Sequence, residues 1–334
     1  MRALLFDAKT TPWRPDIKAP LRSDLGVTQL NAAAQREQSI LRGIVFMCLA
    51  VTAFVCLNAS GKVLSSHGLS TTQIVWSRYL GGLVLMLVLF APRHGLRLMH
   101  TNQPRLQIAR SLLLVASSML YFRGLSYIPL PTAAAISFTS PLFITALSLP
   151  LLAERVGPRR WIAVIIGFAG AMIVIRPGMS GTHWAVAYII ASTTCSVLYQ
   201  VLTRRVAGLD DATTSATYPT LFGTAVVSLF IFMDWSMPAT STDWVIFVCL
   251  GIFGGGGHYF LTRAYELGPA AVISPFNYLQ LVGAIITGYL IFGDFPDNLT
   301  LLGAGIIVCC GLYIAHRESV VRRQRMAQPG GANK

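Results

Sequence analysis

Ten apolar segments of about 20 residues each alternate with short polar stretches along the chain, and a helix of that length crosses the hydrocarbon core of a bilayer. Lipid offers no partner to a backbone amide or carbonyl, so such a segment satisfies its backbone only as a helix. The pattern therefore predicts an all-α integral membrane protein with ten transmembrane helices. We expect these helices at 42–61, 72–91, 106–125, 130–152, 160–176, 183–203, 214–233, 243–262, 270–292 and 299–316.

The composition agrees with a membrane protein. Only 12% of the 334 residues are charged and 54% are hydrophobic, whereas a soluble domain carries about 25% charged residues. The net charge is +13, but it is divided into short clusters between the apolar segments instead of forming one patch beside a soluble core. We therefore expect a lipid bilayer, and no nucleic acid, as a partner of this chain.

The placement of Lys and Arg predicts the orientation in the membrane. Cytoplasmic loops are enriched in these residues, and the loops on the side of the amino terminus carry most of them. The opposite side carries few, namely Lys62, Arg123 and Arg176. The chain is therefore predicted to be a multi-pass protein of the cell inner membrane with both termini in the cytoplasm.

The two ends of the chain are predicted to be cytoplasmic tails. Residues 1–40 contain no apolar core of about 7–15 residues, as a cleavable signal peptide would, and they are rich in Pro and charge. That composition favours a disordered extension. Residues 317–334 form a second, basic tail.

The chain contains an internal repeat of five helices. The segment 131–137 (PTAAAIS) matches 269–274 (PAAVIS), and each follows a helix end that contains aromatic residues. An acidic residue, Glu154 or Asp294, follows each copy of the fourth helix, and a Gly-rich fifth helix comes next. The repeats span 41–177 and 182–316. Because five is odd, the second copy enters the membrane from the opposite side, which is the inverted-repeat plan of secondary transporters that work by alternating access.

This plan, together with the segment AAAISFTSPLFITALSLPLLAE from Ala133 to Glu154, resembles the EamA-type transporters of the drug/metabolite transporter superfamily. The resemblance covers about 42–316. It implies a fourth helix with a small-residue run, a Ser-Pro pair and a terminal Gly-Glu. The first copy has Ser140-Pro141 but Ala153-Glu154, and the second departs further, with Leu279-Gln280 near the expected Pro and Gly293-Asp294 at the end.

Ionisable and amide side chains inside apolar segments are the candidate substrate ligands, because they are costly in lipid without a partner. Asn277 and Gln280 are three residues apart on one helical face. Arg78 lies deep in its segment, whereas Arg123 also fits snorkelling to headgroups, and His258 fits a satisfied neutral histidine equally well. The full candidate set is Asn58, Arg78, Tyr79, Tyr121, Arg123, Tyr199, His258, Tyr259, Asn277 and Gln280.

The run Gly254-Gly255-Gly256-Gly257 is predicted to serve close helix packing, with a hinge as an addition. No Gly-Lys-Ser/Thr follows it, so it is not a phosphate-binding loop. Pro141 belongs to the same group of hinge and packing candidates.

The six cysteines lie in apolar runs without zinc-ligand spacing, and we expect neither a metal nor a cofactor.

Each Asp and Glu beyond the amino-terminal tail lies in a loop or at a helix end, so a strongly cationic substrate would lack a counter-ion at mid-membrane. This favours a neutral or weakly anionic aromatic compound. The overall pattern also resembles bacterial riboflavin and S-adenosylmethionine carriers, which makes riboflavin uptake the leading interpretation. Amino-acid or drug export and S-adenosylmethionine transport remain alternatives.

Two other classes of protein compete with a transporter. An intramembrane serine protease is suggested by the segment 178–181 (GMSG), but Gly, Pro and Ser there also make an ordinary turn, and we expect no enzyme. An accessory membrane subunit would need neither the repeat nor the buried amides Asn277 and Gln280. A small-molecule substrate is therefore the expected partner, and the sequence leaves a homodimer open.

Overall fold

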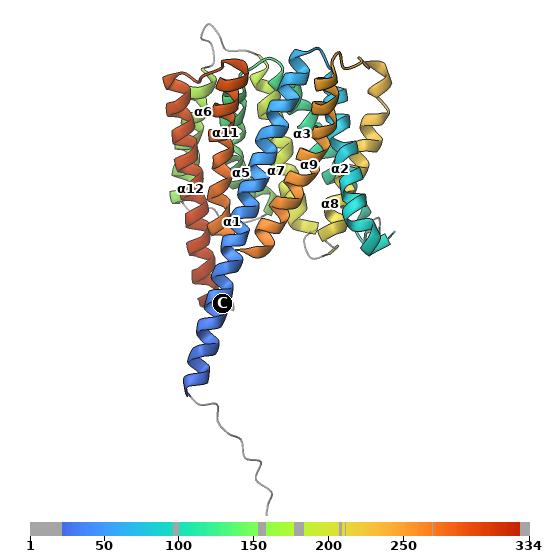
Figure 1. The fold of residues 1–334 in the computed structure, drawn as a ribbon. Coiled ribbons are helices and arrows are strands. Elements are labelled where there is room, and N and C mark those ends of the chain that lie inside the picture. Colours follow the sequence, from blue (N-terminus) through green and yellow to red (C-terminus); the bar gives the residue numbers. More distant parts are fainter. Residues whose placement is uncertain are drawn as a thin grey trace, which may run out of the picture.

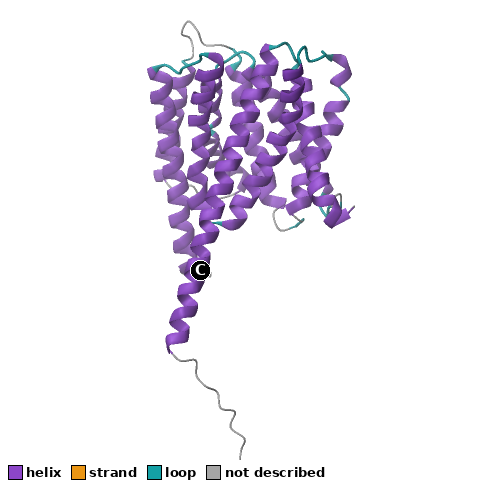
Figure 2. Cartoon of the chain, viewed as in Figure 1, coloured by secondary structure: helices purple, strands orange, loops and turns teal. Residues whose placement is uncertain are grey.

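The computed structural model describes residues 22–95, 100–152, 158–176, 184–206, 209–210, 212–268 and 270–327. Within these ranges the regular elements are helices (Figure 2). Nine helical stretches are long and apolar enough to cross a membrane, and Trp161–Ile175 adds a shorter apolar helix. The prediction of ten membrane helices is therefore confirmed in outline.

The helices pack side by side in one bundle (Figure 1). Their bounds are α1 Arg22–Ser66, α2 Thr71–His94, α3 Pro104–Leu125, α4 Leu130–Ser137, α5 Ser140–Leu152, α6 Pro158–Ile175, α7 Val186–Val206, α8 Ala212–Ser228, α9 Ser241–Leu267, α10 Ala270–Ile273, α11 Leu279–Phe292 and α12 Asn298–Ala327, with short 3₁₀ turns η2 Ile231–Met233 and η3 Ser274–Tyr278.

The packing of these helices repeats with exchanged partners, as inverted repeats require. Helix α1, the first of repeat one, packs along α9, the third of repeat two, and α7 packs along α3 in the same way. The second helices α2 and α8 contact each other, and so do the last helices α6 and α12. The start of α1 and the end of α12 lie at the same end of the bundle (Figure 1), as an even number of crossings demands.

The fourth helix of each repeat is broken, whereas the sequence pattern predicted continuous helices at 130–152 and 270–292. In the first repeat, α4 ends at Ser137 and α5 begins at Ser140. In the second, the 3₁₀ turn η3 separates α10 from α11. Pro141 and Pro275 explain both breaks, because proline has no amide hydrogen to donate and clashes with the preceding turn.

The second break also corrects a detail of the sequence comparison. The Ser-Pro pair of the fourth helix was expected to be missing from the second repeat, near Leu279-Gln280. It is present as Ser274-Pro275, at the start of η3. The pair was overlooked because it lies nearer to the start of its helix than Ser140-Pro141 does.

Helix α1 is longer than expected. It has 45 residues and begins at Arg22, so residues 22–40, predicted to be disordered, are helical, while residues 1–21 lie outside the described part. The segment 32–38 (AAAQREQ) consists of good helix formers. Extending an existing helix needs no new nucleus, so the membrane span propagates outward, and its free end projects from the bundle (Figure 1).

Ion pairs and a hydrogen-bonded contact between His67 and Asp243 join helices at the end of the bundle opposite to the start of α1. The Lys62 ammonium lies 3.0 Å from an oxygen of Asp294 and donates a second hydrogen bond to the Ile128 carbonyl at 3.0 Å. His67 Nδ1 lies 2.7 Å from Asp243 Oδ1. Together with an ion pair between Arg176 and Asp297, these contacts link the ends of helices from both repeats.

Glycines allow α2 and α9 to touch through their backbones. A Cβ atom on Gly251 would overlap the Cα of Gly81, and one on Gly255 would lie 2.9 Å from the Cα of Gly82. A real Cβ atom does not approach backbone so closely. Small residues permit such close approach in membrane helices, so this helix pair depends on its glycines.

We therefore predict that one alanine substitution in α9 destabilises the protein and that a second one in the same helix does not. Gly251→Ala separates α2 from α9 and lowers the free energy of unfolding by about 1–3 kcal/mol. Gly256→Ala is the matched control, because its Cβ would meet only a Phe260 carbon at 4.0 Å and alanine is the better helix former. Thermal melting of the detergent-purified protein measures both, and equal melting temperatures for the two variants would contradict the glycine contact.

Candidate functional site

A central cavity of about 470 Å³ opens between the two repeats, a size typical of small-molecule pockets. Its lining includes residues of α1, α3, α4, α5, α7, α9, α11, α12 and η3. Six of the ten candidate substrate ligands line it, namely Asn58, Arg78, Tyr121, His258, Asn277 and Gln280. The inverted repeats therefore bring together residues that are more than 200 positions apart.

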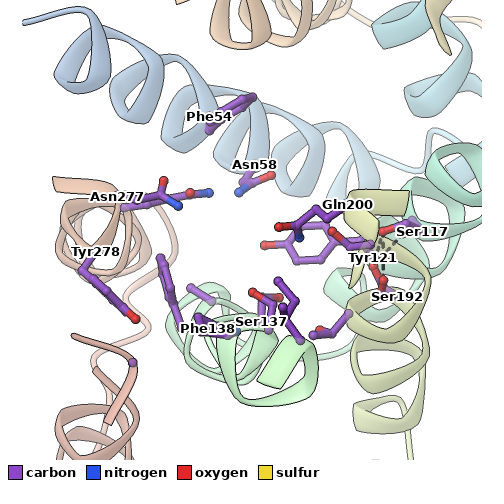
Figure 3. Close-up of a pocket in the computed structure, with 18 of the residues that line it drawn as sticks. Phe54, Asn58, Ser117, Tyr121, Ser137, Phe138, Ser192, Gln200, Asn277 and Tyr278 are labelled. Atoms are coloured by element: carbon purple, nitrogen blue, oxygen red, sulfur yellow. Dashed lines mark hydrogen bonds between the residues drawn. The ribbon is translucent and has the colours of Figure 1, made fainter. Parts of the chain in front are cut away.

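Side-chain amides and aromatic rings face each other across this cavity (Figure 3). Asn58 projects from α1 toward Asn277 of the broken fourth helix, and Gln200 of α7 and Tyr121 of α3 line the same cavity. The rings of Phe138 and Tyr278 lie 5.1 Å apart between centroids, one from each broken helix. This arrangement offers flat apolar faces with a few amide donors and acceptors between them, which suits a planar polar molecule.

Among the described residues that line this cavity, Arg78 carries a permanent charge. Its Nη1 donates to Ser118 Oγ at 2.9 Å, and its Nη2 lies 3.3 Å from His258 Nε2. A guanidinium can only donate, so Nε2 accepts, and His258 is neutral with its proton on Nδ1. The Ser118 hydroxyl also contacts the Tyr79 hydroxyl at 2.9 Å. This contact positions the Ser118 hydroxyl, which accepts the hydrogen bond from Arg78.

A second cavity of about 340 Å³ lies on the side of the chain termini. It meets the central cavity at Arg78, Leu114 and His258, which line both. Two further candidates, Tyr79 and Tyr199, line this second cavity and not the first. The Arg78–His258 contact therefore stands between the two spaces.

Two candidates lie outside both cavities. Arg123 is exposed, and its guanidinium lies 5.3 Å from the ring centroid of Tyr127, which fits the snorkelling alternative. Tyr259 packs against Phe90 with 5.8 Å between ring centroids. Neither side chain lines a cavity, so the geometry gives no support to a substrate contact.

Three of the four glycines in the run occupy contact positions, whereas a Cβ on Gly256 would meet only a Phe260 carbon at 4.0 Å. Gly254, Gly255 and Gly257 lie against Arg78, Gly82 and Phe54 respectively, as close packing requires. Helix α9 continues through the run, and the hinge stays a prediction. Pro141 lines the central cavity beside the break in the fourth helix.

Several lining residues were not on the candidate list. Small hydroxyl side chains of α3, α4, α5 and α7 contribute much of the polar surface, among them Ser137 and Thr145. Ser137 Oγ donates to the Ala133 carbonyl at 2.9 Å. Because a hydroxyl can be satisfied in this way within its own helix, its presence in an apolar segment does not by itself indicate a binding site. Gln200 and Tyr278 also line the cavity. The amide of Gln200 in the middle of an apolar segment is a sequence signal that could have marked it as a candidate ligand.

The central cavity has no carboxylate among the described residues that line it. Within the described part, no cluster of three or more His, Cys, Asp or Glu side chains could hold a metal ion. The protease-like segment 178–181 lies outside the described residues, as does Glu154. The described residues of the central cavity therefore present one permanent cation, neutral amides, hydroxyls and aromatic rings.

Comparison with known proteins agrees with this architecture. A riboflavin transporter of Rhizobium johnstonii is 30% identical over 90% of this chain and 98% of its own length. An S-adenosylmethionine uptake transporter of Rickettsia prowazekii is 26% identical over 84% of this chain and 95% of its own. A riboflavin transporter of Vibrio cholerae is 28% identical over 85% and 96% respectively.

A solved crystal structure shares the fold, with a TM-score of 0.59 and 19% identity over 86% of this chain and 99% of that chain. Residues 41–176 and 183–315 each match the EamA-like transporter family, and these limits agree with the two repeats seen in the packing of α1–α6 and α7–α12. The chain therefore belongs to the EamA-like transporter family as a multi-pass membrane protein.

Proposed function

We propose that this protein carries a neutral or weakly anionic aromatic metabolite, with riboflavin uptake as the specific assignment, by alternating access between its two five-helix repeats. The observation that carries the proposal is the chemistry of the central cavity: aromatic faces, neutral amides and no carboxylate among its described lining residues. Two of the relatives described above are named riboflavin transporters.

Riboflavin has the features that this cavity can recognise. Its fused ring system is planar and can lie against the rings of Phe138 and Tyr278, since offset aromatic packing stabilises such contacts by about 0.5–1.5 kcal/mol. Its ring carbonyls and nitrogens are partners for the amides of Asn58 and Asn277. Buried amides left without partners are costly, which gives the site selectivity for a polar heterocycle over a hydrocarbon.

S-adenosylmethionine is the competing substrate, because a relative of similar length carries that name. Its sulfonium is a permanent positive charge and would enter a cavity that already holds Arg78. A desolvated cation needs a nearby counter-ion, and no described lining residue of the central cavity supplies one. The electrostatics therefore favour the riboflavin assignment.

The proposed location is the cell inner membrane with both termini in the cytoplasm. The start of α1 and the end of α12 lie at the same end of the bundle (Figure 1), and the abundance of Lys and Arg in the loops of that end, which is typical of a cytoplasmic face, supports this proposal. With this orientation the second cavity opens toward the cytoplasm and the ion pairs of Lys62 and Arg176 face outward.

The substrate assignment can be tested with purified protein in proteoliposomes. We expect saturable uptake of labelled riboflavin that excess unlabelled riboflavin suppresses, and little uptake of S-adenosylmethionine or aromatic amino acids. Each compound is measured with and without an imposed pH gradient, and empty liposomes give the background. Preferred uptake of S-adenosylmethionine would contradict the argument from the missing carboxylate.

Removal of the cavity's polar and aromatic groups should weaken this uptake. Tyr121→Ala, Asn277→Ala and Gln280→Ala each remove about 1–2 kcal/mol of contact with substrate, which corresponds to a rise in KM of about tenfold. Tyr259→Ala is the matched control outside both cavities. If all three cavity variants keep the wild-type KM at equal protein levels, the cavity is not the binding site.

A glycine in α12 holds Tyr278 in place and offers a rescue experiment. A Cβ on Gly311 would overlap the Tyr278 hydroxyl, whereas one on Gly305 would meet nothing within 4 Å. We predict that Gly311→Ala raises KM for riboflavin about tenfold by displacing the ring, and that Gly305→Ala has no effect. Adding Tyr278→Phe to Gly311→Ala removes the overlapping oxygen and restores the KM; failure of this rescue would contradict the proposed role of the ring.

A further inference from the structure

The second cavity contains two arginines that lack a counter-ion. Arg78 and Arg110 both line it, and neither guanidinium has a carboxylate within 4.0 Å among the described residues. His258, between the two cavities, accepts from Arg78 and is therefore neutral. The described lining of this cavity thus carries two positive charges and one carboxylate, that of Asp210.

Arg110 is almost completely enclosed, with an exposed fraction of 2%. Its Nη1 donates to Gln107 Oε1 at 2.9 Å and its Nη2 to the Ser215 carbonyl at 2.8 Å. The guanidinium carbon lies 5.3 Å from the ring centroid of Tyr199. Its Nε is a buried nitrogen without a hydrogen-bond partner, and each of its contacts is to a neutral group.

Asp210 makes no direct ion pair with Arg110 within 4.0 Å, and other groups donate hydrogen bonds to its oxygens. Gln107 Nε2 donates to Oδ2 at 2.8 Å, the backbone amide of Asn102 donates to Oδ1 at 2.8 Å, and the Thr101 hydroxyl donates to Oδ2 as well. Burial raises the pKa of this loop carboxyl, but the three hydrogen bonds outweigh it and hold the pKa below its usual range. Gln107 therefore stands between the carboxylate and Arg110.

A desolvated cation with neutral partners alone is energetically unfavourable in a membrane protein. An anion that enters the cavity would supply the missing charge, and guanidinium groups bind carboxylates and phosphates through paired charge-assisted hydrogen bonds. The 340 Å³ of space that Arg78 and Arg110 line gives such a ligand room beside both guanidinium groups.

We propose that Arg78 and Arg110 form a binding site for an anionic group, a carboxylate or phosphate, which the transported molecule or a separate small anion brings into the second cavity. Because the two cavities meet at Arg78, an aromatic molecule in the central cavity can extend a charged arm toward Arg110. The inference rests on the proposed transport function for the aromatic part of the ligand; the anion site itself does not depend on it.

The competing explanation is that Arg110 is a structural cross-link. It joins α3 to α7 through Tyr199 and to α8 through the Ser215 carbonyl, and such a role needs no ligand. The two explanations differ in one measurable respect. A cross-link affects stability alone, whereas an anion site also changes the affinity for ligands that differ by one negative charge.

Equilibrium binding to the detergent-purified full-length protein tests the proposal. The probes are riboflavin, riboflavin 5′-phosphate and inorganic phosphate, each at matched ionic strength. We expect riboflavin 5′-phosphate to bind at least about tenfold more tightly than riboflavin, as one charge-assisted contact would give. If the substrate carries the anionic group, inorganic phosphate should compete with riboflavin 5′-phosphate but not with riboflavin. If phosphate binds to the protein but competes with neither flavin, the site takes a separate small anion.

Variants locate the site. Arg110→Gln and Arg78→Gln should abolish the preference for the phosphorylated probe and the binding of phosphate, while Arg110→Lys keeps the charge and part of the preference. Arg123→Gln is the matched control, since that arginine lies outside both cavities. If Arg110→Gln fails to fold, Arg110→Lys and Arg78→Gln still report the effect.

Three outcomes are decisive. Absence of phosphate binding and equal affinity for the two flavins in the wild type would overturn the anion site. Unchanged preference in folded Arg110→Gln and Arg78→Gln would do the same and leave the cross-link. Phosphate binding that depends on Arg110, without any binding of either flavin, would support the anion site and reject the riboflavin assignment.

Discussion

The structure depends on one constraint: inside a bilayer, water cannot satisfy a polar group, so each donor and acceptor must find its partner within the protein. Most hydroxyls in the spans meet this demand locally, as Ser137 does with the Ala133 carbonyl. Lipid-facing positions are apolar, for example Val88 and Leu290. The amides and the two arginines that cannot be satisfied within their own helix gather between the repeats, and this concentration of polarity is what makes a site.

Inversion of the repeats explains why the site has its particular shape. Each fourth helix is broken near a Ser-Pro pair, and the inversion brings the two breaks to face each other across the bundle. Residues of the two breaks, Phe138 and Tyr278, then meet at 5.1 Å. The break interrupts the regular packing of the helix and leaves side chains beside it available to the cavity. The same feature that weakens the helix therefore contributes to the binding face.

The number of helices, the repeat and most of the central cavity could be predicted from the sequence, because length, hydropathy and isolated amides such as Asn277 are local signals. The breaks could not, since a proline in an apolar run is compatible with a continuous kinked helix. Arg123 and Arg78 have similar apolar neighbours, and the face on which each lies depends on packing with other helices. Arg110 was not among the candidates, because it follows the start of α3 by only six positions and a cation near a helix end is ordinary; its contacts with α7 and α8 depend on the tertiary packing.

The ion pairs at the end opposite to the termini have a consequence for the conformational equilibrium. An opening of that end that moves α1 away from Asp294 and α6 away from Asp297 breaks the ion pairs of Lys62 and Arg176, whereas closing re-forms these contacts between partly exposed charges. Such contacts are worth up to about 1 kcal/mol each and are screened by salt. The balance between the two access states therefore shifts with the ionic strength of the solution on the side of the membrane opposite to the chain termini, so the salt concentration on that side affects the turnover rate of the carrier.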